Sequence, residues 1–75
     1  MSSEDALSAE GVVTAVLSER AFRVVLSNGH EMVGHASLRL QEAVAGLQTG
    51  DLVLMALSPF DLSAGRITKV TKKQS

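Results

Sequence analysis

The chain has 75 residues and no cysteine, so neither disulfides nor a thiolate metal site can stabilise it. This length allows one domain with a thin aliphatic core, and 45% of the residues are hydrophobic. The net charge of −1 gives no general attraction for nucleic acid. No apolar run reaches the roughly 18 residues that span a bilayer, and residues 1–10 lack the features of a secretory signal. We therefore expect a cytoplasmic protein without membrane contact.

The first part of the chain predicts a tail, a strand and a turn. Residues 1–9 are small, polar and acidic, so we expect a flexible tail before a folded domain at 10–71. The run at 11–17 is rich in β-branched residues, which favours a strand, and 18–21 has the composition of a turn. The basic residues at 72–75 are expected to form a second tail.

Asn28-Gly29 lies between two apolar runs and predicts a β-hairpin. A type I′ turn needs positive φ at both central residues, which Asn and Gly tolerate best. Strands at 22–26 and 30–36 are therefore expected to pair across a two-residue loop.

The register of this hairpin decides where His35 points. A two-residue loop places His35 opposite Phe22, so an unbroken ladder would turn both side chains into the core. A buried imidazole would need a hydrogen-bonding partner. We therefore expect a β-bulge at Gly34, which would turn His35 outward toward Arg23.

A short helix is predicted after the third strand. Ser37 is a suitable N-cap and Gly46 is placed to end the helix in the left-handed conformation. Apolar residues recur between them, and just beyond, at helical spacing: Leu40, Ala43, Val44 and Leu47. Leu38 lies off this apolar face.

Two more strands complete the chain. A turn at 49–51 precedes an apolar strand at 52–57, and a polar loop at 60–65 precedes an alternating strand at 66–71. Three strands, a short helix and two strands predict a small all-β protein, the five-stranded OB-fold barrel with its helix between strands 3 and 4. An SH3-like barrel is the structural alternative, although its usual layout lacks this helix.

The sequence contains few of the residue combinations that catalysis requires. The serines are scattered, neither histidine has an obvious orienting acid, and no phosphate loop or metal-ligand spacing occurs. We therefore expect no enzymatic activity, no metal and no cofactor. The candidate binding residues are Arg23, His30, His35, Arg39, Arg66 and Lys69.

Each candidate also has an ordinary interpretation as a solvated surface charge or, for His35, as a structural histidine. On a regular strand Arg66 and Lys69 would face opposite sides, so they predict no continuous basic stripe. For Phe60 we favour packing in the core or a loop over stacking on a base.

Residues 10–67 resemble bacterial translation initiation factor 1, an OB-fold family. The resemblance rests on these blocks: Gly11-Val12-Val13, Phe22-Arg23-Val24, Leu26-Ser27-Asn28-Gly29-His30, Gly34-His35-Ala36-Ser37, Thr49-Gly50-Asp51 and 57–67. It implies a noncatalytic, monomeric protein that binds the small ribosomal subunit, through ribosomal RNA and ribosomal protein, at the A site during initiation. Other initiation factors are its further implied partners. The residues that fall on or near the family's RNA surface are Arg23, His30, His35, Arg39 and Arg66.

The departures from the family concern charge. The family usually carries a strongly basic helix and turn, where this chain keeps only Arg39 and has Gln41, Glu42 and Gly46. Ala64 likewise replaces a customary lysine. Each lost phosphate contact lowers the affinity for RNA and flattens its salt dependence by about one unit of slope.

Three functions are compatible with this sequence. The first is a divergent initiation factor, and the second is an OB-fold paralogue whose neutral helix has become a protein-binding face, with weakened RNA binding. A general binder of single-stranded nucleic acid is the third, disfavoured by the lack of surface aromatics for base stacking. An exposed Leu38 grouped with other apolar residues would favour the second.

Overall fold

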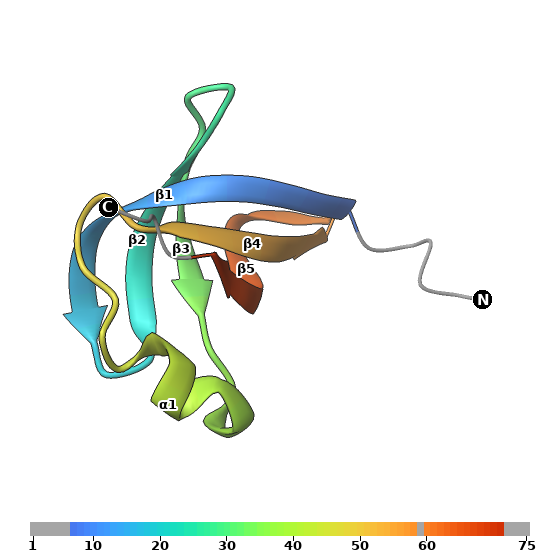
Figure 1. Ribbon diagram of the computed structural model, residues 1–75. Helices are drawn as coiled ribbons and strands as arrows, with labels where there is room; N and C mark the ends of the chain where they lie inside the picture. Colours follow the sequence, from blue (N-terminus) through green and yellow to red (C-terminus); the bar gives the residue numbers. More distant parts are fainter. Residues whose placement is uncertain (1–6, 59, 72–75) are drawn as a thin grey trace.

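Five strands and one short helical segment form the fold in the computed structural model, which describes residues 7–58 and 60–71. They are β1 (Leu7–Ser18), β2 (Ala21–Leu26), β3 (Glu31–His35), the 3₁₀ turn η2 (Leu38–Leu40), α1 (Gln41–Val44), β4 (Leu52–Ser58) and β5 (Asp61–Thr71). The strands close into a barrel in the order β1-β2-β3-β5-β4, and only β3 and β5 are parallel (Figure 1). This confirms the predicted OB-fold, with its helix between strands 3 and 4.

β1 and β5 begin several residues earlier than predicted. β1 begins at Leu7, inside the segment predicted as a tail, because residues 7–9 pair with β4. β5 begins at Asp61, so the predicted loop at 60–65 is wrong. Residues of that segment pair with the end of β3 and thereby close the barrel. Residues 1–6 of the first predicted tail and the whole of the second, 72–75, lie outside the described residues.

The loop of the central hairpin has three residues instead of two. Leu26 donates its N–H to the carbonyl of His30 (2.9 Å) and accepts from the N–H of Gly29 (2.8 Å). Gly29 has a φ of 91°, and the Asn28 side chain accepts the His30 N–H at 2.9 Å. A three-residue loop with a left-handed glycine at its third position is a common hairpin connection, and it adds one residue to the predicted loop.

The longer loop turns His35 outward without a bulge at Gly34. Phe22 pairs with Gly34 and Ala21 with His35, in a ladder that runs without a register shift. Phe22 is buried and His35 is exposed. The predicted bulge at Gly34 is therefore wrong, because the extra residue lies in the turn.

Gly34 has a packing role instead. It pairs with Gly65 of β5, and a Cβ at either position would lie close to Met55 Cε, at 3.1 and 2.8 Å respectively. Met55 itself is fully buried. The two glycines therefore make room for this large side chain in a core that also includes Val13, Phe22, Val24, Val53 and Ile67.

The helical segment covers one end of the barrel (Figure 1). Val44 and Leu47 are buried as predicted, but Ala43 is exposed. The glycines with positive φ are Gly29 and Gly50, so Gly46 does not adopt the left-handed conformation expected of it. One 3₁₀ turn followed by one α-helical turn is too short to present the full predicted face. No helix in the described part of the chain has the length and hydropathy to cross a membrane.

Candidate nucleic-acid interface

Three of the six predicted site residues come together on the outside of the barrel. The parallel pairing of β3 and β5 places His35 opposite Arg66, and both are exposed. They line a shallow hollow of about 330 Å³. Arg66 also lines a second hollow, of about 610 Å³, to which η2 contributes Arg39. Arg66 thus lies between His35 and Arg39.

The two hollows form one electropositive surface. Ser37 lines both of them, so they adjoin where the chain leaves β3. No aspartate or glutamate among the described residues lines either hollow. Guanidinium groups donate several hydrogen bonds in a planar fork that fits phosphate, so this surface suits an anionic ligand.

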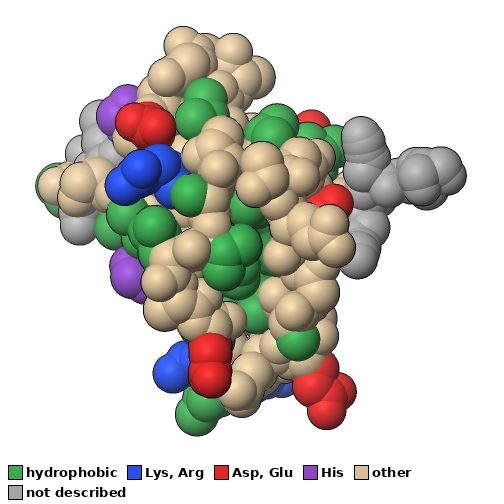
Figure 2. Space-filling model, turned by 90° about the vertical axis from the view of Figure 1, so that its left-hand side faces the viewer, with side chains coloured by type: hydrophobic (Ala, Val, Ile, Leu, Met, Phe, Trp, Pro, Cys, Tyr) green, Lys and Arg blue, Asp and Glu red, His purple; other side chains and the backbone are tan. Residues whose placement is uncertain are grey.

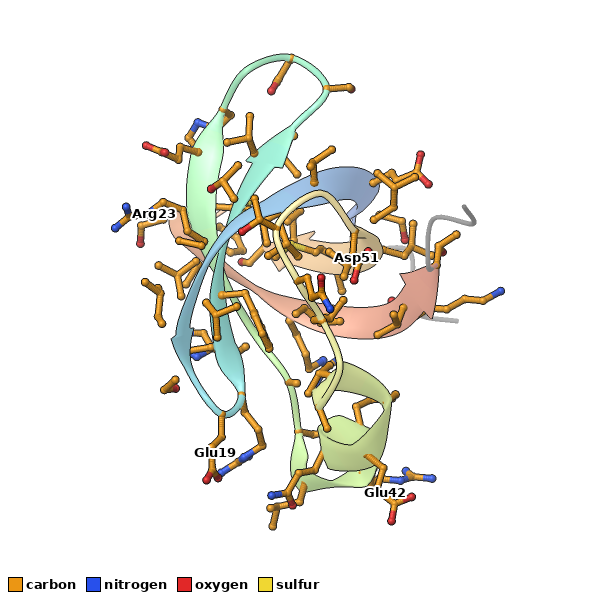
Figure 3. The ribbon with its side chains drawn as sticks, turned by 60° about the vertical axis from the view of Figure 1, so that its left-hand side comes forward. Glu19, Arg23, Glu42 and Asp51 are labelled. Atoms are coloured by element: carbon orange, nitrogen blue, oxygen red, sulfur yellow. The ribbon has the colours of Figure 1, made fainter. Side chains whose placement is uncertain are left out.

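Arg23 extends this surface across β2. It pairs with Val33 of β3, which pairs in turn with Ala64 of β5, and both of these apolar residues are half-buried. Arg23 points away from the barrel (Figure 3). Figure 2 shows both histidine side chains on one side of the molecule, with acidic, basic and hydrophobic side chains between them. We call the surface of Arg23, His35, Arg39 and Arg66 the cationic face.

His30 and Lys69 lie outside the two hollows. His30 is exposed at the end of the hairpin loop. Lys69 is exposed on β5, as is Arg66, while Ile67 and Val70 pack into or against the core. The pairing with β4 shifts at Thr68, which adds a residue to β5. The expectation that Arg66 and Lys69 face opposite sides is therefore wrong, because this bulge changes the alternation.

Arg20 supports the cationic face, although the sequence indicated only a turn there. Its Nη1 donates to the carbonyl of Ala36 (3.2 Å), and the Ala36 N–H donates back to the carbonyl of Arg20 (2.8 Å). Ala36 stands between His35 and Ser37, so this double contact fixes the chain where it leaves β3. No local sequence pattern pairs a turn arginine with a residue so far along the chain.

Phe60 does not pack into the core. It is 94% exposed, so the favoured interpretation is wrong. Its N–H donates to Ser58 Oγ at 3.1 Å in the turn between β4 and β5. Phe60 lines neither hollow of the cationic face.

The helical segment adds little positive charge. Gln41 and Glu42 are exposed beside Arg39. Leu38 is 68% exposed and lines neither hollow of the cationic face. Leu38 therefore meets the condition of exposure under which the protein-binding alternative would be favoured.

The chain is similar in structure to a known initiation factor. No family model matches the sequence. The solution structure of translation initiation factor 1 from the Wolbachia endosymbiont (strain TRS) of Brugia malayi shares 36% sequence identity with this chain, with a TM-score of 0.69. The match covers 97% of this chain and 86% of that one. The similarity therefore extends over the whole barrel.

Proposed function

Because the chain belongs to the translation initiation factor 1 family, we propose that it binds the small ribosomal subunit at the A site during initiation. The observation that carries this proposal is the convergence of His35, Arg39 and Arg66 on two adjoining hollows without an acidic residue. Phosphate contacts dominate the affinity of proteins for RNA, and folded RNA is recognised through its backbone and exposed bases. The role is noncatalytic and consists of occupying the site.

All six predicted residues belong to this proposal. The cationic face forms its centre, while His30 and Lys69 would contact the RNA at its margins. Ribosomal protein and other initiation factors are the additional partners. We propose that the factor is monomeric, since each described strand has a paired neighbour on both sides in the closed barrel, which protects its edges from self-association. We also propose that it acts in the cytoplasm.

Cosedimentation with purified small subunits tests the binding. Three to four phosphate contacts predict a slope of log affinity against log salt concentration between about −2 and −4. Footprinting of the ribosomal RNA with and without the protein then locates the site, and we expect protection at the A site. The proposal is wrong if the folded protein does not cosediment at low ionic strength, or if protection occurs only elsewhere.

A further inference from the structure

A second surface, separate from the cationic face, has the shape of a docking groove. It lies between the end of β1 and α1 and has a volume of about 320 Å³. Its floor is apolar, since Phe22, Val44 and Leu47 line it and are at most 5% exposed. Val16 and Ala45 form its exposed apolar walls. We call this surface the helix-side groove.

Irregular pairing of β1 explains why the groove exists. The register between β1 and β2 shifts between Val13 and Ala15 and again between Val16 and Ser18, and each shift adds a residue to β1. Such bulges bend a strand and increase its twist. Val16 is consequently 54% exposed beside the groove, although its pairing partner Phe22 is buried. An exposed valine above an apolar floor offers a partner further apolar area.

The charge at the groove is acidic. Glu19 lines it, and Glu42 is exposed next to Gln41, which also lines it. Figure 3 shows Glu19 at the tip of the β1–β2 turn and Glu42 on α1, at the same end of the molecule. The arginines nearest in sequence to these two glutamates serve other contacts. Arg20 donates to the Ala36 carbonyl, and Arg39 lines a hollow of the cationic face.

We propose that the helix-side groove docks a protein segment with one apolar anchor side chain flanked by lysine or arginine. The anchor would cover the apolar floor, and the basic residues would face Glu19 and Glu42. RNA fits this groove poorly, because its phosphates would meet those carboxylates and Phe22 is too buried to stack on a base. The groove shares no lining residue with the two hollows of the cationic face, so both surfaces can be occupied together.

Titration of the ¹⁵N-labelled full chain with short synthetic peptides tests this inference. The probe carries a central leucine between lysines and arginines. Of two altered peptides, one has alanine for the leucine and the other has glutamate for the basic residues. We expect amide shift changes at Val16, Ser18, Gln41 and Ala45, and roughly tenfold weaker binding of the alanine peptide, since burial of a leucine is worth more than about 1.4 kcal/mol. The glutamate peptide should not bind.

Two substitutions in the helical segment provide a matched pair. Ala45→Gln places a larger, uncharged side chain in the groove and should weaken peptide binding at least about fivefold, a cost typical of overpacking. Ala43→Gln makes the same change at an exposed alanine that does not line the groove, and should leave binding unchanged. Thermal unfolding establishes that both variants fold. Absent binding, shift changes confined to the cationic face, equal binding of the leucine and alanine peptides, or equal losses in the two variants would each overturn the proposal.

Discussion

Gly29 determines which face of the barrel His35 occupies. Its left-handed conformation closes a three-residue loop that also takes in Ser27, and this longer loop moves every later residue of β3 by one position against β2. Because side chains alternate along a strand, a shift of one position exchanges the inner and outer faces. Gly34 then points inward at Met55, and His35 points outward beside Arg66. The position of a candidate binding side chain therefore depends on a backbone conformation several residues away.

Replacing Gly29 should destabilise the protein through the backbone alone. A Cβ at this position meets no atom within 4 Å, but the φ of 91° strains any other residue. We expect Gly29→Ala to lower the free energy of unfolding, measured by urea denaturation, by about 1 kcal/mol. Gly46→Ala is the matched control, because a Cβ there also has open space and the backbone is not left-handed. It should leave the stability unchanged or raise it by about 0.5 kcal/mol. Equal losses in the two variants would refute this explanation.

At the level of elements, β5 assembles the site. β5 pairs with β3 on one side and with β4 on the other, and it holds Arg66 next to His35. The bulge at Thr68, whose Oγ1 donates to the Leu54 carbonyl at 3.2 Å, then brings Lys69 to the outer surface as well. The two basic residues of β5 therefore lie in different environments. Arg66 lines both hollows of the cationic face, and Lys69 lies outside them.

This difference predicts unequal effects of removing the two charges. Arg66→Gln should reduce the affinity for small subunits about tenfold at low salt and flatten the salt dependence by about one unit of slope. Lys69→Gln removes one charge from the same strand, outside both hollows, and should cost about threefold or less. Salt titrations of both variants by cosedimentation provide the comparison. If the two losses were equal, affinity would follow total charge and the hollows would have no special role.

For the whole molecule, the order of elements could be predicted because each depends on local pattern: β-branched runs, the Asn-Gly signal and the apolar spacing after Ser37. Several of the parts that failed depend on partners remote in sequence, whereas the length of the hairpin loop is a local feature that the Asn-Gly signal alone does not determine. The segment at 61–65 has the composition of a loop and becomes a strand only because β3 provides a parallel partner. Likewise, the contact of Arg20 with Ala36 exists only once the barrel has closed. The candidate residues could be found from their chemistry, but which of them cluster could not.

The functions proposed for the two surfaces favour opposite charges at the position of Glu42. This residue is exposed on α1, which follows the η2 turn that carries Arg39, and it is next in sequence to Gln41, which lines the helix-side groove. A lysine at this position would add a cation next to the cationic face and remove an acid next to Gln41, which lines the groove. We therefore expect Glu42→Lys to raise the affinity for small subunits by up to about tenfold, with a slope steeper by about one unit. The same variant should bind the leucine peptide about threefold more weakly, as expected for the loss of an exposed charge pair.

Glu10→Lys is the control for this last prediction. Glu10 is exposed on β1 and lines neither the groove nor the hollows of the cationic face, yet its replacement changes the net charge equally. Cosedimentation and peptide titration of the same preparations separate the two effects. If Glu10→Lys raised ribosome affinity as much as Glu42→Lys, the gain would come from net charge alone. If Glu42→Lys left peptide binding unchanged, Glu42 would not belong to the groove's acidic rim. Opposite changes confined to Glu42→Lys would show that the charge on this short helix sets the balance between an RNA partner and a protein partner.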